Sequence, residues 1–314
     1  MSGPQPQPQP QPPSLSHRAL QAWQTNAAHW DATITKHGNK YWRRLQEPSL
    51  RRLLAPTLSK SGRGSSGNGG CRALDLATGN GLCARWLAAN GAQDVLATDG
   101  CEEMLDLARG YWEGEEHGQG GGGEGGAGRM RMKFRKVDVT SEADLGRLVD
   151  EEGRFDVVVM NMAVMDVADL GPLARALAEG LVAGGGVFVA TLLHPVFFTS
   201  GAARNIDVRF DPVTGECKVV RTKVIEEYMS VPPAMGIAVP GQPVKQVLNV
   251  HALKKQLYFH RPMHELFATF FKAGLVMDAM EELAFTAEDA EERIESSSNY
   301  TQLPAILAFR MRLP

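Results

Sequence analysis

The sequence has few cysteines, and they form no pattern typical of a metal site or a disulfide framework. The four cysteines are Cys71, Cys83, Cys101 and Cys217, and no two of them stand in a CxxC pair. This spacing is typical of reduced thiols in a cytosolic protein. We therefore predict a cytoplasmic location and no metal site.

The sequence also lacks an excess of charge of either sign. The formal net charge is -3 over 314 residues, so the chain as a whole offers no attraction to nucleic acid or to an anionic membrane. The hydrophobic fraction of 43% and the charged fraction of 22% are ordinary for a globular protein and exclude a wholly disordered chain.

No stretch of the sequence has the pattern of a secretory signal or of a membrane span. The N-terminal residues are polar and rich in Gln and Pro, without the apolar core of a signal peptide. The longest apolar stretch, residues 180–198, contains three glycines at 184–186 and the pair His194-Pro195. These breaks indicate a turn followed by a buried strand rather than a membrane helix.

Low-complexity segments divide the chain. Residues 1–15 are a Pro/Gln repeat, which predicts a disordered tail because alternating proline removes backbone donors. The Ser/Gly-rich residues 59–70 and the Gly-rich residues 118–128 predict surface loops. Residues 16–58 form an N-terminal helical segment in this interpretation, and residues 70–314 form the main domain.

The N-terminal helical segment carries aromatic side chains in a polar stretch, namely Trp30, Tyr41 and Trp42. They could cover the edge of the core or lie over a bound ligand. Packing is the commoner use of aromatic side chains in such a segment, so packing is the prediction.

Apolar runs of strand length alternate with helical patterns in the main domain. The predicted strands are 73–77, 94–98, 133–137, 156–161 and 187–193, and the predicted helices are 83–89, 102–111, 143–151 and 172–181. Continuously hydrophobic strands are typical of a parallel sheet that is covered on both faces. Right-handed crossovers then give a doubly wound, Rossmann-like α/β sheet.

The C-terminal part departs from this alternation. Residues 210–221 predict a hairpin, and several prolines make the stretch after it irregular. A helix near 262–273 and strands near 276–285 and 305–313 follow. An antiparallel last strand that closes a parallel sheet would account for this order, and residues 196–258 form an insertion after the fifth strand.

The strongest chemical signal is the run LDLATGNG, residues 74–81, at the end of the first strand. Glycine lets the backbone turn sharply next to a ligand, and the following helix offers free N–H groups. Gly79, Gly81 and Ala84 also satisfy the dinucleotide pattern GxGxxG/A, and Asp99 lies where a ribose-binding acid is expected. An NAD-dependent oxidoreductase is therefore an alternative.

Two features weigh against the oxidoreductase. Asp75 precedes the glycine loop, where a carboxylate would repel a pyrophosphate and attract a cationic amino group. The Tyr-x-x-x-Lys pair of short-chain dehydrogenases is absent from the region after the fourth strand.

Four motifs in this order resemble the class I S-adenosylmethionine-dependent methyltransferases: LDLATGNG, VLATDGCEEMLDLA, FDVVVMNMAVMDVADL and LVAGGGVFVATLLHP. The resemblance is closest to the small-molecule, ubiquinone-biosynthesis-like branch. It covers about residues 70–195 and more weakly the C-terminal part. It implies a seven-stranded sheet with an antiparallel last strand, and S-adenosyl-L-methionine as cofactor.

The resemblance also implies roles for individual residues. Asp75 and the loop Ala77, Thr78, Gly79, Asn80 and Gly81 would hold the methionine portion, although the family often has glycine at position 77. Asp99 would accept hydrogen bonds from both ribose hydroxyls. The remaining predicted cofactor contacts are Gly100 and Met104 at the adenine and ribose, Asp138 and Val139 at the adenine, and Asn161 beside the methionine chain and the methyl.

A catalytic base is harder to choose. His194 follows the fifth strand at the carboxyl edge of the sheet and could deprotonate an acceptor, although a turn-shaping role for His194-Pro195 is the alternative. Asp166 could line the pocket or cap a helix. The other candidates are Tyr41, His251, Tyr258, His260 and Arg261.

The sequence thus predicts an enzyme that transfers a methyl group to an oxygen or nitrogen of a small organic metabolite. The insertion 196–258 is apolar enough to form a cap over such an acceptor. We expect no nucleic-acid partner, because no NPPY-like run follows the fourth strand, and no membrane partner. A cofactor-binding scaffold without catalysis remains an alternative, because the motifs report only cofactor contacts.

Overall fold

The structure is a computed structural model, and it describes residues 13–59, 70–118, 130–198, 202–237 and 255–314. The predicted tail lies outside the described residues for residues 1–12. The same holds for most of the two Gly-rich segments and for residues 199–201 and 238–254 of the insertion, which include His251.

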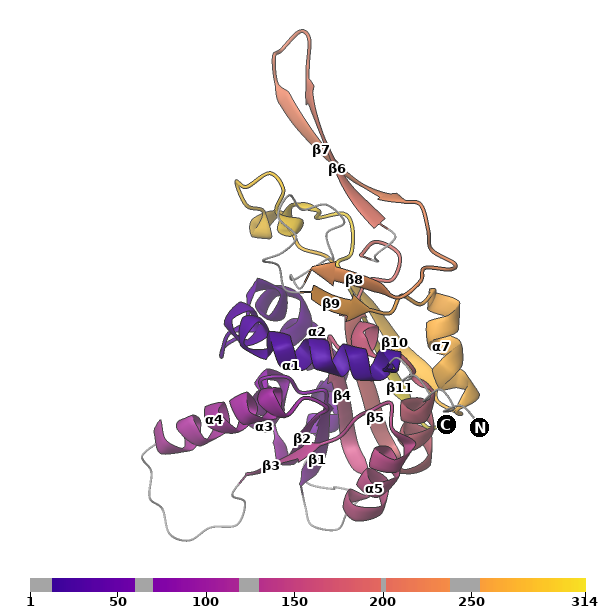
Figure 1. Ribbon diagram of the computed structural model, residues 1–314. Coiled ribbons are helices and arrows are strands. Elements are labelled where there is room, and N and C mark those ends of the chain that lie inside the picture. The colour runs from indigo at the N-terminus through magenta and orange to yellow at the C-terminus, as the bar shows by residue number, and fades with distance from the viewer. Residues whose placement is uncertain (1–12, 60–69, 119–129, 199–201, 238–254) are drawn as a thin grey trace, which may run out of the picture.

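A seven-stranded sheet with the order β10-β11-β5-β4-β1-β2-β3 forms the centre of the molecule (Figure 1). Its strands are β1 (Cys71–Leu76), β2 (Ala92–Asp99), β3 (Arg131–Lys136), β4 (Phe155–Asn161), β5 (Val182–Leu193), β10 (Val276–Leu283) and β11 (Ile306–Arg312). The first five strands pair in parallel, whereas β11 is antiparallel to both of its neighbours. The predicted doubly wound sheet with an antiparallel last strand is confirmed.

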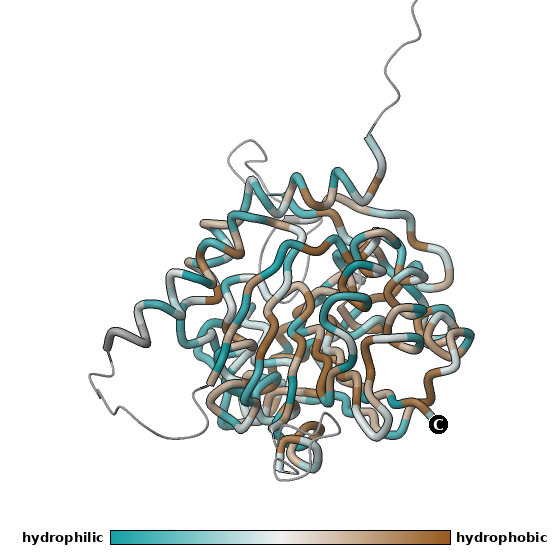
Figure 2. The backbone as a smooth tube through the Cα atoms, turned by 90° about the horizontal axis from the view of Figure 1, so that it is seen from below, coloured by the Kyte–Doolittle hydropathy of each residue, from teal (hydrophilic) through white to brown (hydrophobic). Residues whose placement is uncertain are grey.

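The central strands are buried on both faces, as their continuous apolar runs predict. All but one or two residues of β1 and β4 are buried. The prediction fails for β3, where no residue is buried, because β3 is the edge strand of the sheet. Figure 2 shows the hydrophobic segments concentrated in the strands, with mixed hydropathy along the helices around them.

Helices cover both faces of the sheet. They are α2 (Glu47–Leu58), α3 (Leu82–Ala89), α4 (Glu102–Gly118), α5 (Glu142–Glu152), α6 (Gly171–Ala176) and α7 (Met263–Lys272). One core cluster joins α5, α6 and α7 to the sheet through side chains such as Leu148, Leu173 and Phe270. A second cluster joins α2 and α3 to the sheet through Leu54 and Leu87.

The N-terminal segment is helical, as predicted. It contains α1 (Leu15–Ile34), a π-helical turn η1 (Trp42–Gln46) and then α2. Helix α1 lies between the sheet and the strand pair β8 (Ala234–Ile237) and β9 (Lys255–Tyr258) (Figure 1). The Asn26 amide in α1 donates to the Lys255 carbonyl at 2.7 Å and to Gln256 Oε1 at 3.3 Å, which fastens α1 to β9.

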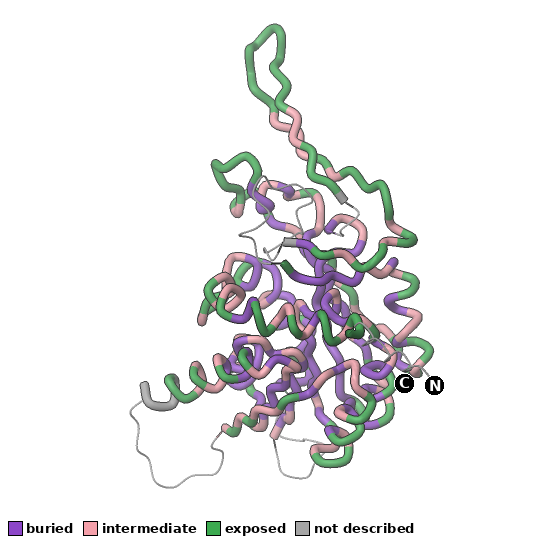
Figure 3. Tube along the Cα trace, in the orientation of Figure 1, coloured by how far each residue is buried: buried purple, intermediate pink, exposed green. Residues whose placement is uncertain are grey.

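The predicted hairpin is present and longer than expected. Strands β6 (Ala202–Phe210) and β7 (Cys217–Ile225) pair over nine residues each. The Asp211 carboxylate closes the turn by accepting from the backbone N–H groups of Val213 and Thr214, each at 2.8 Å. Figure 3 shows this hairpin as a mostly exposed arm, in contrast to the buried sheet.

In the part of the chain that the structure describes, no helix combines the length and the apolar character needed to cross a bilayer.

Candidate active site

A cavity lies at the carboxyl ends of the parallel strands, beneath α1. In open α/β sheets this edge is where ligands bind. Ten of the twelve predicted cofactor contacts line the cavity: Asp75, Ala77, Thr78, Gly79, Asn80, Asp99, Gly100, Asp138, Val139 and Asn161. Four segments far apart in the sequence, each at or after the end of a different strand, therefore meet at one place.

Asp75 is buried at the end of β1, with 1% of its surface exposed. Its Oδ2 accepts from the Thr78 hydroxyl at 2.6 Å, whereas the buried Oδ1 has no hydrogen-bond partner of normal geometry. Burial raises the pKa of Asp75 to about 7, although the nearby side chains of Thr78 and Cys83 favour the charged form. A buried oxygen without a partner is costly, so this atom is suited to a cationic ligand group.

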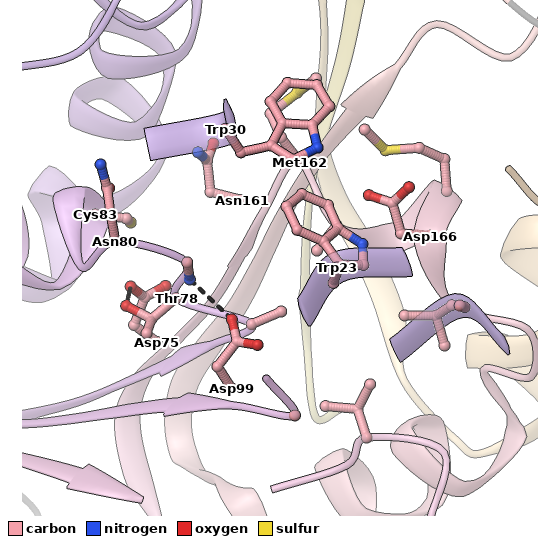
Figure 4. A pocket seen from close by; sticks show the side chains of 18 of the residues that line it. Trp23, Trp30, Asp75, Thr78, Asn80, Cys83, Asp99, Asn161, Met162 and Asp166 are labelled. Atoms are coloured by element: carbon pink, nitrogen blue, oxygen red, sulfur yellow. Dashed lines mark hydrogen bonds between the residues drawn. The ribbon is translucent and has the colours of Figure 1, made fainter. Parts of the chain in front are cut away.

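Asp99 ends β2 and holds the glycine loop in place. Its Oδ2 accepts from the Gly79 backbone N–H at 2.9 Å, and its Oδ1 accepts from the Cys101 backbone N–H at 2.9 Å. Figure 4 shows Asp99 next to Asp75 and Thr78 on one side of the pocket. Burial raises the pKa of Asp99 to about 6, while these backbone donors favour its charged form.

The loop after β1 has the left-handed backbone that its glycines permit. Gly79 has a φ of 57°, and a Cβ atom built there would meet nothing within 4 Å. Ala77 adopts φ 53° without being glycine, and so does Met162 after β4 with φ 57°. Such strained residues cluster at functional sites, and both of these line the cavity.

Asp138 and Asn161 line the cavity, and some of their side-chain hydrogen-bonding atoms are already paired within the protein. Asp138 Oδ1 accepts from the N–H and the hydroxyl of Thr140, both at 2.8 Å. The Asn161 amide donates to Gln46 Oε1 at 3.0 Å and accepts from the Thr191 hydroxyl at 2.7 Å. Asn161 therefore ties η1 and β5 to the floor of the cavity.

Gly81 and Met104 do not line the cavity. Gly81 is the N-cap of α3, and a Cβ atom there would lie 2.9 Å from Ala108 Cβ, so the glycine permits close packing of the start of α3 on α4. Met104 is fully buried and packs with Ala27 and Cys101 beneath the tryptophans of α1.

His194 also lies outside the cavity. Its Nδ1 accepts from the Val196 N–H at 3.2 Å, so the other ring nitrogen, Nε2, donates to Glu282 Oε1 at 2.9 Å. The ring is 1% exposed, and burial lowers its pKa. With both nitrogens engaged away from the cavity, the geometry gives no support to His194 as a base.

The N-terminal segment supplies one wall of the cavity. The sequence offered Trp30, Tyr41 and Trp42 for such a place but not Trp23. Trp23 and Trp30 stack with ring centroids 5.5 Å apart, and both line the cavity together with Tyr41 and Trp42. Tyr41 and Trp42 also pack in the second core cluster, as predicted. The helical pattern of residues 16–58 gave no sign that Trp23 reaches the site.

Polar contacts fasten α1 to the glycine loop. The Asn80 amide donates to Asp31 Oδ1 at 2.9 Å, and the Tyr111 hydroxyl donates to Asp31 Oδ2 at 3.0 Å. Arg85 donates to the Asn80 carbonyl at 2.7 Å and to the Lys36 carbonyl at 2.8 Å. The helix is thus part of the site rather than a separate extension.

The sequence profile described as a methyltransferase domain matches residues 40–273, well over half of the chain. The chain belongs to the methyltransferase family. This confirms the predicted enzyme class, class I S-adenosylmethionine-dependent methyltransferase, and its cofactor. Membership also decides against the NAD-dependent alternative that the glycine motif left open. The ubiquinone-biosynthesis-like branch stays a prediction.

Solved structures of low sequence identity share the fold. An S-adenosylmethionine-dependent methyltransferase from Mesorhizobium loti is 21% identical, with a TM-score of 0.53 over 88% of this chain and 100% of its own. A structure from Listeria monocytogenes assigned to the same enzyme class is 18% identical, with a TM-score of 0.50 over 86% of this chain and 99% of its own. No curated protein shows a significant sequence match.

Proposed function

We propose that this methyltransferase moves a methyl group from S-adenosylmethionine to an oxygen or nitrogen of a small organic molecule. The observation that carries the proposal is the buried Asp75 carboxyl. Its Oδ1 has no hydrogen-bond partner of normal geometry, and the residue lines a cavity next to a loop with left-handed backbone at Ala77 and Gly79. The ammonium of a methionine group would satisfy that oxygen and favour the charged carboxylate.

The residues of the cavity fit the rest of the cofactor. Asp99, already held by two backbone donors, would accept from the ribose hydroxyls through its remaining lone pairs. The loop backbone at Gly79 leaves open space for the ligand to approach. The stacked Trp23 and Trp30 would cover it from α1 and exclude water.

The cofactor supplies a methyl group on a positively charged sulfur. The task of the chain is to bind the acceptor in line with that methyl and to keep water out. Asn161 and Met162, at the end of β4, would form the boundary between the cofactor and the acceptor.

Calorimetric titration with S-adenosylhomocysteine tests the proposal, with NADH as the competing ligand. We expect binding of the sulfur compound and none of NADH. Transfer of a labelled methyl group to a metabolite extract, followed by mass spectrometry, then identifies the acceptor. NADH binding without binding of the sulfur compound would contradict the proposal.

A further inference from the structure

One cavity residue has no role in the cofactor site described above. Asp166 ends the short 3-10 helix η2 (Val164–Asp166) after β4 and lines the cavity with 8% of its surface exposed. Its Oδ1 is buried and has no hydrogen-bond partner. Figure 4 shows Asp166 across the pocket from Asp75 and Asp99, with Trp23 between them.

The walls around Asp166 are apolar and aromatic. The apolar and aromatic residues that line the same cavity include Ala19, Leu20, Trp23, Met165, Val167, Ala168, Leu193 and Tyr258. Tyr258 ends β9 and lies close enough for the charge of Asp166 to raise its pKa, which burial already raises. A carboxyl group set among aromatic rings is a combination that recognises a cation.

The segment that carries Asp166 is held firmly. The Arg261 guanidinium donates to the Val167 carbonyl at 2.7 Å and to the Ala168 carbonyl at 2.8 Å. The Phe259 N–H donates to the Met165 carbonyl at 2.8 Å. These bonds fix the backbone on both sides of Asp166, so its carboxyl is preorganised without any partner of its own.

We propose that Asp166 binds the methyl acceptor, that the acceptor is a primary or secondary amine, and that the carboxylate takes the proton which the amine nitrogen loses. The inference rests on the proposed function and names the substrate class of the same site. The amine binds as an ammonium paired with the Asp166 carboxylate, which takes one N–H proton and leaves a neutral nitrogen with a lone pair. That lone pair forms the bond to the methyl carbon while the methyl–sulfur bond breaks with its electrons left on sulfur. The methylated nitrogen then carries the positive charge.

Proton affinities favour nitrogen over an alkyl hydroxyl at this position. Burial raises the pKa of Asp166 well above its ordinary value. An alkylammonium has a pKa of about 10, whereas the pKa of an alkyl hydroxyl group is far higher. A carboxylate of raised pKa therefore accepts the proton of an ammonium far more readily, and pairing with the cation lowers the cost of its own burial.

Calorimetry with three probes of one shape tests the inference. Phenethylamine, 2-phenylethanol and phenylacetate are titrated into the protein saturated with S-adenosylhomocysteine. We expect the amine to bind at least about tenfold more tightly than the alcohol, with phenylacetate weakest. Asp166→Asn keeps the shape of the side chain and should abolish the preference for the amine. Asp169→Asn, an exposed carboxyl on the same loop, should retain it.

The outcomes separate this inference from the proposed function. Absence of S-adenosylhomocysteine binding would overturn both. If that ligand binds to wild type and to Asp166→Asn with similar affinity, the variant is folded and the cofactor site is intact. Three results would then overturn the role of Asp166 alone. They are equal binding of the amine and the alcohol, failure of the amine to bind, and an amine preference that Asp166→Asn retains. A labelled product methylated on oxygen would do the same.

Discussion

The two halves of the cavity are built in different ways. The half proposed to hold the cofactor consists of strand ends and the turns that follow them. There Asp75, Asp99 and Asp138 each accept from backbone or hydroxyl donors of residues nearby in the sequence or after the neighbouring strand. The proposed acceptor half is bordered by α1, η2 and β9, of which α1 and β9 contact each other across more than 200 positions, as Asn26 and Gln256 do. Local chain geometry sets the first half, and long-range packing sets the second.

This difference predicts that single substitutions in the two halves affect different ligands. A variant in the cofactor half should weaken cofactor binding directly. A variant in the acceptor half should leave cofactor affinity near that of wild type and change the binding of the acceptor or the rate of methyl transfer to it.

The largest effect is expected for Asp99→Ala. The substitution removes the acceptor for the ribose hydroxyls and also the contacts that hold Gly79 and Cys101. We expect the affinity for S-adenosylhomocysteine in calorimetry to fall by about 100-fold. Asp106→Ala, on the outer face of α4, serves as the control and should bind like wild type. Unchanged affinity in Asp99→Ala would refute the ribose assignment.

Arg261→Lys should weaken the acceptor half and slow methyl transfer. Lysine cannot reproduce the guanidinium contacts to Val167 and Ala168, so the segment that carries Asp166 loses its support. We expect the rate of methyl transfer to fall by roughly tenfold, with the affinity for S-adenosylhomocysteine within about twofold of wild type. A parallel loss of cofactor affinity would show that the two halves are not separable in this way.

The pH dependence of cofactor binding should follow Asp75. Burial raises its pKa to about 7 in the ligand-free protein, and the ammonium of the ligand favours the ionised form. Binding must therefore displace a proton below this pH, and the affinity should fall by up to about tenfold per pH unit. Titrations between pH 8 and pH 6 measure this slope. A flat profile would mean that Asp75 does not meet the ammonium group.

Asp75→Asn should be more stable than wild type in the absence of ligand. The pKa of Asp75 is raised from 3.8 to about 7, so the folded protein keeps a proton that the unfolded chain loses. Stability contributed by this proton is present below about pH 4 and is lost as the pH rises to about 7. At pH 8 we expect the variant to gain about 1–3 kcal/mol in the free energy of unfolding, measured in urea. A loss of stability would contradict the burial argument.

The sequence was sufficient to predict that ten of the twelve residues expected at the cofactor line one cavity, because these residues follow predictable strands within short motifs. Gly81 and Met104 do not line the cavity, because Gly81 packs against α4 and Met104 packs in the core beside Ala27 and Cys101. His194 follows β5 as expected, but its N–H donates to Ala305 and its ring meets Glu282, so the chain turns away from the cavity there. Trp23 could not be assigned, because only the packing of α1 against β9 brings it to the site.

A crystal structure of the protein with S-adenosylhomocysteine tests the central claim most directly. We predict that the ribose hydroxyls lie within hydrogen-bond distance of Asp99, that the ammonium meets Asp75 Oδ1, and that the sulfur faces the side of the cavity that holds Asp166. A ligand bound elsewhere, or one whose ammonium points toward Asp166 instead of Asp75, would contradict the division of the cavity into a cofactor half and an acceptor half.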